Sequence, residues 1–326
     1  MITTPTILVL GAGASCPYGF PTARELKWQI CDAFENVTKT AALFLGHKSD
    51  YMPSEFVDFA HALTHSGQHS VDQFLEHRAK EFMEIGKLSI AYCLIRYEDE
   101  RKLFRPKLDC GGGDWYEYLF GKLNAPFPEF AQNQLSVVTF NYDRSLEHYL
   151  LTANRNSYKK SLEECAPMFQ KIRFIHVYGQ LGEYPYPDTR CHKYRPENDE
   201  FTDVVRASRG IKLLFETSGP LAEARSLLTA AKKVCFLGFG YDPLNLERLK
   251  LQDSSSQRNA FGDCSWVKRR WIDRRKGQSS SDTLVPEHYA RRRGQPYIAA
   301  VLSNPWLSQK SCPQLHGHLQ FKTLSK

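Results

Sequence analysis

Four short runs of β-branched and other apolar residues divide the first 250 residues of the chain. Each run ends in small or polar residues, a pattern that is typical of strands buried on both faces of a parallel sheet. The runs cover residues 6–10, 136–140, 173–177 and 233–237. We predict that these four segments are the parallel strands of one sheet.

Between these runs, apolar residues recur with helical spacing. Thr22 and Glu25 have the spacing of a capping box, and Leu26 and Ile30 follow on one face of the predicted helix. Further helical patterns cover residues 71–94 (with an interruption at Gly86), 114–123, 145–151 and 219–231. Strands that alternate with helices predict an α/β fold with a Rossmann-like, doubly wound parallel sheet.

The segment between the first two strands is unusually long. Roughly 95 mostly helical residues lie between the first helix and the second strand, more than a crossover between parallel strands needs. We predict a helical subdomain inserted at about residues 38–130, which forms one wall of a cleft. Residues 1–250 then make up the main domain, and residues 251–326 a separate tail.

Composition excludes several classes of protein. With 42% hydrophobic and 24% charged residues the chain can build a sizeable core, and no apolar run approaches the roughly 18 residues of a membrane span. The first apolar run leads directly into Gly11, as a buried strand does and a signal peptide does not. Nine cysteines without a Cys-x-x-Cys pair predict reduced thiols in a cytoplasmic protein and no structural zinc site.

The net charge of +7 comes from the tail. Residues 251–326 hold 13 Lys+Arg and 5 Asp+Glu, whereas residues 1–250 hold 30 and 31. The tail is rich in Ser, Arg, Pro and Gln and has no sustained apolar periodicity. Three explanations stay open: a disordered basic arm, an oligomerisation segment, or the product of a shifted reading frame. Contact with nucleic acid is expected only through this tail or indirectly.

A glycine-rich loop follows the first strand. Residues 11–15 read Gly-Ala-Gly-Ala-Ser and precede a capped helix, which is where doubly wound folds bind a nucleotide pyrophosphate. Cys16 occupies the place of the third glycine of the dehydrogenase fingerprint, so hydride transfer is disfavoured. The alternative is a tight turn without a ligand.

The other three strands also end in polar or glycine-rich segments. Asn141 and Asp143 follow the second strand, His176 lies in the third, and Gly238 and Gly240 follow the fourth, with Asp242 and Asn245 beyond them. Open α/β sheets bind ligands at the carboxyl ends of their strands. The alternatives are an Asx turn that caps the next helix, a histidine that belongs to the core, and a glycine turn without a ligand.

These segments, in this order, resemble the sirtuin family. His176 resembles the sirtuin catalytic histidine, although two residues separate it from Gly179, and Phe140 stands where the nicotinamide-binding motif has glutamine. The zinc ribbon of that family is missing. The residues that match the loop covering bound NAD are Gly11, Ala12, Gly13, Ser15, Gly19, Pro21 and Arg24; those that match the nicotinamide and ribose motif are Thr139, Asn141 and Asp143.

The sequence is similar to the sirtuin-like domains of bacterial antiphage defence systems, over about residues 5–250. Members of this branch typically read Gly-Ala-Gly-Ala-Ser, Phe-Asn-Tyr-Asp, His-Val-Tyr-Gly and Leu-Gly-Phe-Gly-Tyr. The resemblance implies an NAD glycohydrolase that acts as the toxic effector of abortive infection, with NAD as substrate and no metal. It also implies a homo-oligomer and a partner encoded nearby, such as an ATPase, a nuclease or a sensor.

The expected roles follow from cleavage of the bond between nicotinamide and ribose, which passes through an oxocarbenium-like state. We expect Asn141 to orient the ribose and the water, His176 to act as general base or ribose-hydroxyl partner, and Asp143 to hold the carboxamide or stabilise positive charge. Pyrophosphate contacts are expected from Gly13, Ala14 and Ser15, closure over the ligand from Arg24, and adenosine contacts from Gly238, Gly240 and Asn245.

Two other functions use the same site. A protein deacylase or ADP-ribosyltransferase would also consume NAD, although the missing zinc ribbon argues against deacylation. A non-catalytic sensor would bind NAD or ADP-ribose tightly and signal by assembly.

Overall fold

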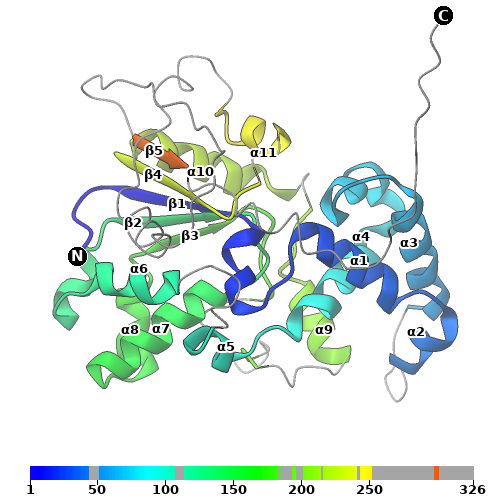
Figure 1. The fold of residues 1–326 in the computed structure, drawn as a ribbon, viewed down its shortest axis with the longest axis horizontal. Coiled ribbons are helices and arrows are strands. Elements are labelled where there is room, and N and C mark those ends of the chain that lie inside the picture. Colours follow the sequence, from blue (N-terminus) through cyan, green and yellow to red (C-terminus); the bar gives the residue numbers. More distant parts are fainter. Residues whose placement is uncertain are drawn as a thin grey trace, which may run out of the picture.

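A parallel sheet forms the centre of the computed structural model (Figure 1), which describes residues 1–43, 51–106, 114–182, 184, 193–195, 201–213, 216–240, 243–251 and 297–300. The strand order is β3-β2-β1-β4-β5, and all neighbours are parallel. The prediction of an α/β fold with a parallel sheet is confirmed, and this order is compatible with a Rossmann-like fold. The strands are β1 (Thr6–Leu10), β2 (Leu135–Thr139), β3 (Arg173–His176), β4 (Lys233–Leu237) and β5 (Tyr297–Ala300).

Helices connect the strands and cover the sheet. Between β1 and β2 lie α1 (Ala23–Ala33), α2 (Val37–Leu43), α3 (Pro53–His65), α4 (Val71–Ile95), α5 (Glu100–Phe104) and α6 (Trp115–Leu123), together with the 3-10 turns η1 (Ala12–Ala14), η2 (Cys16–Tyr18) and η4 (Phe127–Gln132). The later helices are α7 (Ser145–Tyr158), α8 (Leu162–Phe169), α9 (Phe201–Ser208), α10 (Ser218–Ala230) and α11 (Pro243–Arg248). Figure 1 shows α6, α7 and α8 on one face of the sheet, α10 on the other, and α1–α4 beyond one end of the strands.

Each face of the sheet has its own hydrophobic core, because successive side chains of a strand point to opposite faces. Ile7 and Val9 of β1 belong to a core shared with α1, α3, α4, α9 and α10. Leu8 and Leu10 belong to a second core, shared with α6, α7 and α8. The first core continues without a break from the sheet into the helices between β1 and β2, so those helices pack as part of the same hydrophobic unit.

The structure corrects several predicted boundaries. Helix α7 extends to Tyr158, seven residues beyond the predicted end at Leu151. Helix α4 is kinked at Arg78, where φ is −122°, and not at Gly86. A Cβ at Gly86 would lie 2.7 Å from a methyl group of Leu75, so this glycine permits close packing within the helix. The predicted capping box of α1 is present, with Thr22 and Glu25 bonding each other's backbone N–H groups.

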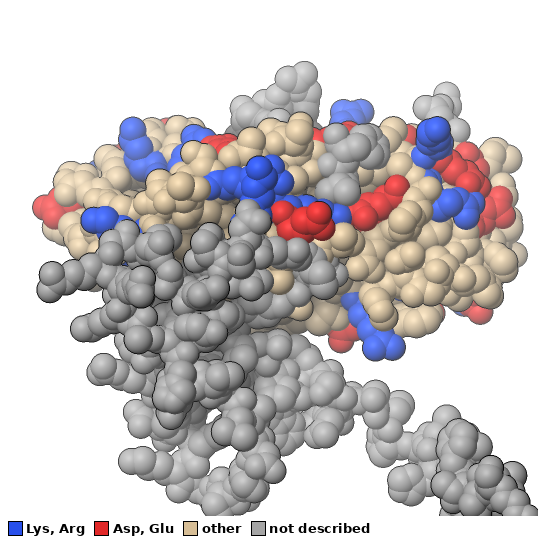
Figure 2. Space-filling view, turned by 90° about the horizontal axis from the view of Figure 1, so that it is seen from above, with Lys and Arg blue, Asp and Glu red and all other residues tan. Residues whose placement is uncertain are grey.

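The tail contributes one described element. Strand β5 pairs with β4 within the segment where no element was predicted; its short apolar run was not recognised as a strand because the surrounding tail has no sustained periodicity. The remaining tail, residues 252–296 and 301–326, lies outside the described residues. Over the described part of the face in Figure 2, Lys and Arg side chains alternate with Asp and Glu, in keeping with the near-neutral composition of residues 1–250.

The described ranges contain no helix that is both long and apolar enough to cross a membrane. Their cysteines are Cys16, Cys31, Cys93, Cys165 and Cys235, all of them free thiols.

The loops that follow β1 and β4 pack backbone against backbone. Gly11 N–H donates to Leu237 O at 3.0 Å, and Gly13 N–H donates to Gly238 O at 3.1 Å. Gly238 has a φ of +57°, and a Cβ added to it would lie 1.9 Å from Ala14 N. This contact explains why glycine follows the fourth strand at position 238, since a side chain there would push the two loops apart.

We expect Gly238→Ala to destabilise the fold. The left-handed backbone alone costs a residue with a Cβ about 1 to 3 kcal/mol, and the contact with Ala14 adds to this. Gly240→Ala is the matched control, because a Cβ there meets no atom within 4 Å. Urea unfolding followed by circular dichroism measures both variants, and equal midpoints would contradict the packing described here.

Candidate functional site

The four predicted motifs begin at one edge of the sheet. Leu10 pairs with Thr139 on one side and with Leu237 on the other, and Thr139 pairs with His176. The segments that carry the candidate residues therefore leave four adjacent strands at the same level. Their side chains can meet only because the sheet is parallel and in register.

Ser15 joins the glycine loop to the end of β2. Its hydroxyl donates to Asp143 Oδ2 at 2.8 Å and accepts a hydrogen bond from Asn141 Nδ2 at 3.1 Å. All three residues are buried. The prediction placed Ser15 against a pyrophosphate, whereas the structure places its hydroxyl between the two polar residues that follow β2.

Asn141 has one polar atom without a partner. Its Nδ2 also donates to Gly11 O at 3.0 Å, which fixes the orientation of the amide, because a flipped amide would set oxygen against carbonyl oxygen. Its Oδ1 is buried and accepts no hydrogen bond from the described residues. A buried acceptor left unsatisfied costs roughly 1 to 3 kcal/mol, so such an atom calls for an explanation. A hydroxyl or water that donates to it would remove this cost.

His176 lies between two acceptors. Its Nδ1 is 3.0 Å from Asn141 O, and its Nε2 bonds the Glu147 carboxylate. Burial lowers the pKa of His176, but the negative charge of Glu147 and both hydrogen bonds outweigh it, so the pKa is raised above that of an ordinary histidine. Since both ring nitrogens face acceptors, the arrangement favours the doubly protonated imidazolium.

Asp143 is held by protein groups at both oxygens. Oδ2 accepts from Ser15, and Oδ1 accepts from the hydroxyl and, at 3.2 Å, the N–H of Ser145 at the start of α7. Burial raises the pKa of this carboxyl, while the bonds from Ser145 and Ser15 lower it. The Asx-turn alternative is therefore present alongside the contact with Ser15.

Three residues near the cluster were not expected from the sequence. Glu147 is the most important, and it lies on the first turn of α7, where its carboxylate bonds His176. Trp115 Nε1 donates to Ala14 O at 2.8 Å, and Tyr116 OH lies 2.6 Å from Ser145 Oγ. Both aromatic residues begin α6, which was noted as a helix but not linked to the site.

The backbone N–H groups of the glycine loop already donate to carbonyl groups of the protein. Gly13 N–H donates to Gly238 O, Ala14 N–H to Gly11 O, and Ser15 N–H to Ala12 O, at 2.9 to 3.1 Å. Two 3-10 turns, η1 and η2, make up the loop between β1 and α1. In this conformation the loop is folded on itself, so pyrophosphate contact would require these bonds to be exchanged.

The remaining candidates lie apart from this cluster. Arg24 is exposed on the first turn of α1, with Pro21 half-buried before it, and Gly240 is exposed after β4. Asn245 lies on α11, where its Oδ1 accepts at 2.9 Å from Tyr178 OH and from Arg248 Nη1. Asp242 is outside the described residues.

Polar contacts join α4 to this edge of the sheet. Tyr142 OH donates to Asp72, and Arg248 pairs with Glu76. Both acidic residues lie on the first turns of α4. The N-terminal part of α4 is therefore in contact with the segments that follow β2 and β4. An ion pair and a hydrogen bond between buried or half-buried groups hold α4 in this position, and the cleft itself stays a prediction.

Histidines 61, 65 and 69 do not share one helix. His65 is the last residue of α3, and its Nδ1 bonds His61 O at 2.8 Å, whereas His69 lies beyond the helix. Within the described ranges, no group of three or more His, Cys, Asp or Glu side chains gathers as a metal site would require.

Comparison of the sequence with protein-family models and with curated proteins finds no match.

We expect Glu147→Gln to lower the pKa of His176. Burial, which lowers this pKa, would no longer be opposed by a carboxylate, so the ring should lose its proton at lower pH. NMR titration of the histidine ring protons measures this, with Glu129→Gln, an exposed glutamate outside the site, as control. An unchanged titration of His176 in Glu147→Gln would contradict the pairing.

The same pair should make stability depend on pH. Because the folded-state pKa of His176 is raised, its stabilising contribution is complete below the pKa of an unfolded histidine and is lost as pH rises through the raised value. Urea midpoints measured from acid to alkaline pH should therefore fall over this range in the wild type and fall less in Glu147→Gln.

Proposed function

We propose that the protein is an NAD glycohydrolase, which cleaves NAD to nicotinamide and ADP-ribose. The observation that carries the proposal is the unsatisfied Oδ1 of Asn141, buried beside the ion pair of His176 and Glu147 at the carboxyl edge of the sheet. A ribose hydroxyl or a water molecule would supply the missing donor. The sirtuin-like order of the motifs supports NAD as the source of that ribose.

The reaction needs few groups from the protein. The bond between the anomeric carbon and the nicotinamide nitrogen breaks with its electron pair on nicotinamide, and water adds to the anomeric carbon and loses a proton. Asn141 is the residue we assign to orienting the ribose or the water, with its Nδ2 held by Gly11 O and Ser15 Oγ. A fixed amide of this kind contributes orientation rather than proton transfer.

The pair of His176 and Glu147 is suited to accept the proton. His176 can pass its Nε2 proton to Glu147 and then take up the proton that the water loses. Before that transfer, the negative charge of Glu147 offsets the imidazolium charge, so that the pair adds no net positive charge beside the ribose. Asp143, whose oxygens already hold Ser15 and Ser145, is better suited to positioning Ser15 and Asn141 than to binding the carboxamide.

Binding of the whole dinucleotide would require local movement. The N–H groups of residues 13–15 would have to exchange their internal bonds for the pyrophosphate, and Asn245 would have to leave Tyr178 and Arg248 to reach the adenosine half. An enzyme of this type is toxic when constantly active. A closed resting conformation suits the proposed role as an effector of abortive infection, which rests on the resemblance alone.

We expect Asn141→Ala and His176→Ala each to lower NAD consumption by a factor of about 100 or more, because Asn141 orients the reacting groups and His176 is a positioned proton-transfer group. Chromatography of nicotinamide and ADP-ribose, with purified protein alone and with the products of neighbouring genes, measures this. His77→Ala, an exposed histidine on α4, is the control and should keep the wild-type rate.

Undiminished NAD consumption in both variants would refute the assignment. Tight NAD binding without turnover in the wild type would favour the sensor. Nicotinamide release that depends on an acetylated peptide would favour the deacylase.

A further inference from the structure

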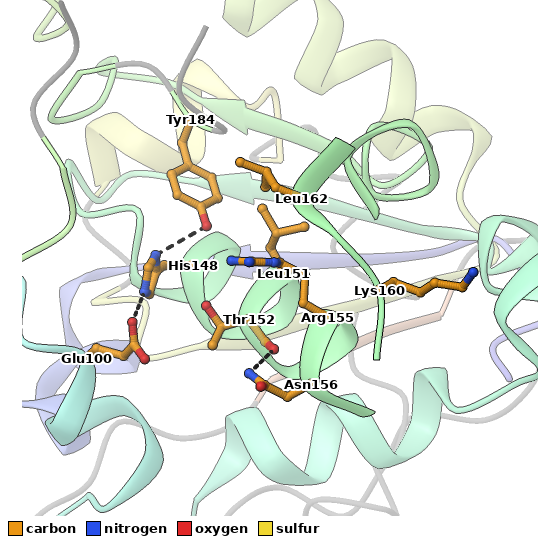
Figure 3. Close-up of a pocket in the computed structure, with 9 residues that line it drawn as sticks. All are labelled: Glu100, His148, Leu151, Thr152, Arg155, Asn156, Lys160, Leu162 and Tyr184. Atoms are coloured by element: carbon orange, nitrogen blue, oxygen red, sulfur yellow. Dashed lines mark hydrogen bonds and ion pairs between the residues drawn. The ribbon is translucent and has the colours of Figure 1, made fainter. Parts of the chain in front are cut away.

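A second candidate site lies beside α7, outside the cluster described above. It is a cavity of about 260 Å³ between α7, the first residue of α5 and the first residue of α8 (Figure 3). None of the residues predicted from the sequence to bind NAD lines it. The lining residues are Glu100, His148, Leu151, Thr152, Arg155, Asn156, Lys160, Leu162 and Tyr184.

One wall of the cavity is a row of three hydrogen-bonded side chains. Figure 3 shows His148 between Tyr184 and Glu100; its Nε2 is 2.8 Å from Glu100 Oε2, and its Nδ1 is 3.2 Å from Tyr184 OH. Burial lowers the pKa of His148 more than Glu100 raises it, which favours the neutral ring. A neutral ring that donates from Nε2 to Glu100 and accepts at Nδ1 from Tyr184 satisfies every group in the row.

The rim carries positive charge. Arg155 is exposed and forms no ion pair within the described part of the chain. Lys160 pairs with Glu164 at 2.8 Å, but both side chains are more than one third exposed, so this pair is weak and exchangeable. The guanidinium fork of Arg155 is suited to bidentate contact with a phosphate.

We propose that this cavity binds a small phosphate-bearing molecule whose carrier is hydroxylated, such as a sugar phosphate. Arg155 and Lys160 would hold the phosphate at the rim. Glu100 would accept from hydroxyl groups at the other wall, where a second phosphate would be repelled. The volume is below the roughly 300 to 1,000 Å³ of common ligand pockets, which suits a pentose phosphate and not a complete dinucleotide.

The cavity and the candidate active site share one helix. Glu147 bonds His176, and the next residue, His148, lines the cavity. A ligand that shifts His148 would therefore act on the helix that also positions Glu147. The binding proposal itself does not rest on NAD hydrolysis.

Calorimetric titration of the full chain with ribose 5-phosphate, ADP-ribose and inorganic phosphate tests the proposal. It is done in the Asn141→Ala background, which removes the amide assigned to the ribose at the proposed NAD site, and Arg155→Ala then separates binding in the cavity from binding at that site. We expect saturable binding of ribose 5-phosphate, weakened at least tenfold by Arg155→Ala. Lys80→Ala, which removes an exposed positive charge from α4, is the control and should bind as its parent does.

The three probes distinguish the possible sources of the phosphate. Tighter binding of ribose 5-phosphate than of ADP-ribose, lost in Arg155→Ala, supports a site for a free sugar phosphate, whereas tighter binding of ADP-ribose contradicts the ligand size argued from the cavity volume. The proposal is overturned if none of the three probes binds, if Arg155→Ala binds as tightly as its parent, or if inorganic phosphate binds as tightly as the sugar phosphates.

Discussion

The ion pair between Arg144 and Glu98 joins the sheet to the helices inserted after β1. Its two hydrogen bonds measure 2.8 and 3.0 Å, and neither side chain has any exposed surface. Arg144 lies between Asp143, which holds Ser15, and the start of α7, which carries Glu147. Glu98 follows the end of α4. Loss of one partner from a buried pair leaves an uncompensated charge that costs roughly 3 to 5 kcal/mol, so both ends are constrained together.

That constraint accounts for the position of the candidate site. The residues after β2 are held from one side by Glu98 and from another by Asp72, and both of these come from the helical segment. The polar cluster is therefore built by two parts of the chain that are distant in sequence. Removing the inserted helices would expose hydrophobic surface and would also release the backbone that aligns Asn141, Asp143 and Glu147.

Sequence patterns predicted the strands better than the contacts between them. The strands 6–10 and 233–237 were predicted with their observed bounds, because continuous apolar runs mark strands buried on both faces. The end of α7 was missed because residues 152–158 are mostly polar, and tertiary packing keeps them helical. Glu147 was missed because its role depends on a contact with β3. That strand begins 26 residues after Glu147, and no local pattern in the sequence predicts such a contact.

The convergence of the site was predictable in outline. Parallel strands place their carboxyl ends at one edge, so Ser15, Asn141, Asp143 and His176 could be expected to lie close together. Which polar atoms are satisfied could not be predicted, since it depends on side-chain geometry. The unsatisfied Oδ1 of Asn141 and the occupied oxygens of Asp143 distinguish their roles, and both are visible only in three dimensions.

The backbone contact between the loops after β1 and β4 also restricts how the site can open. Gly11 and Gly13 both donate to the end of β4, and Gly13, Ala14 and Gly238 leave no space for sliding. Gly11 and Gly13 therefore cannot release their N–H groups without disturbing the end of β4. The two loops form a single cooperative opening unit, whose amide protons should exchange with solvent at a common rate.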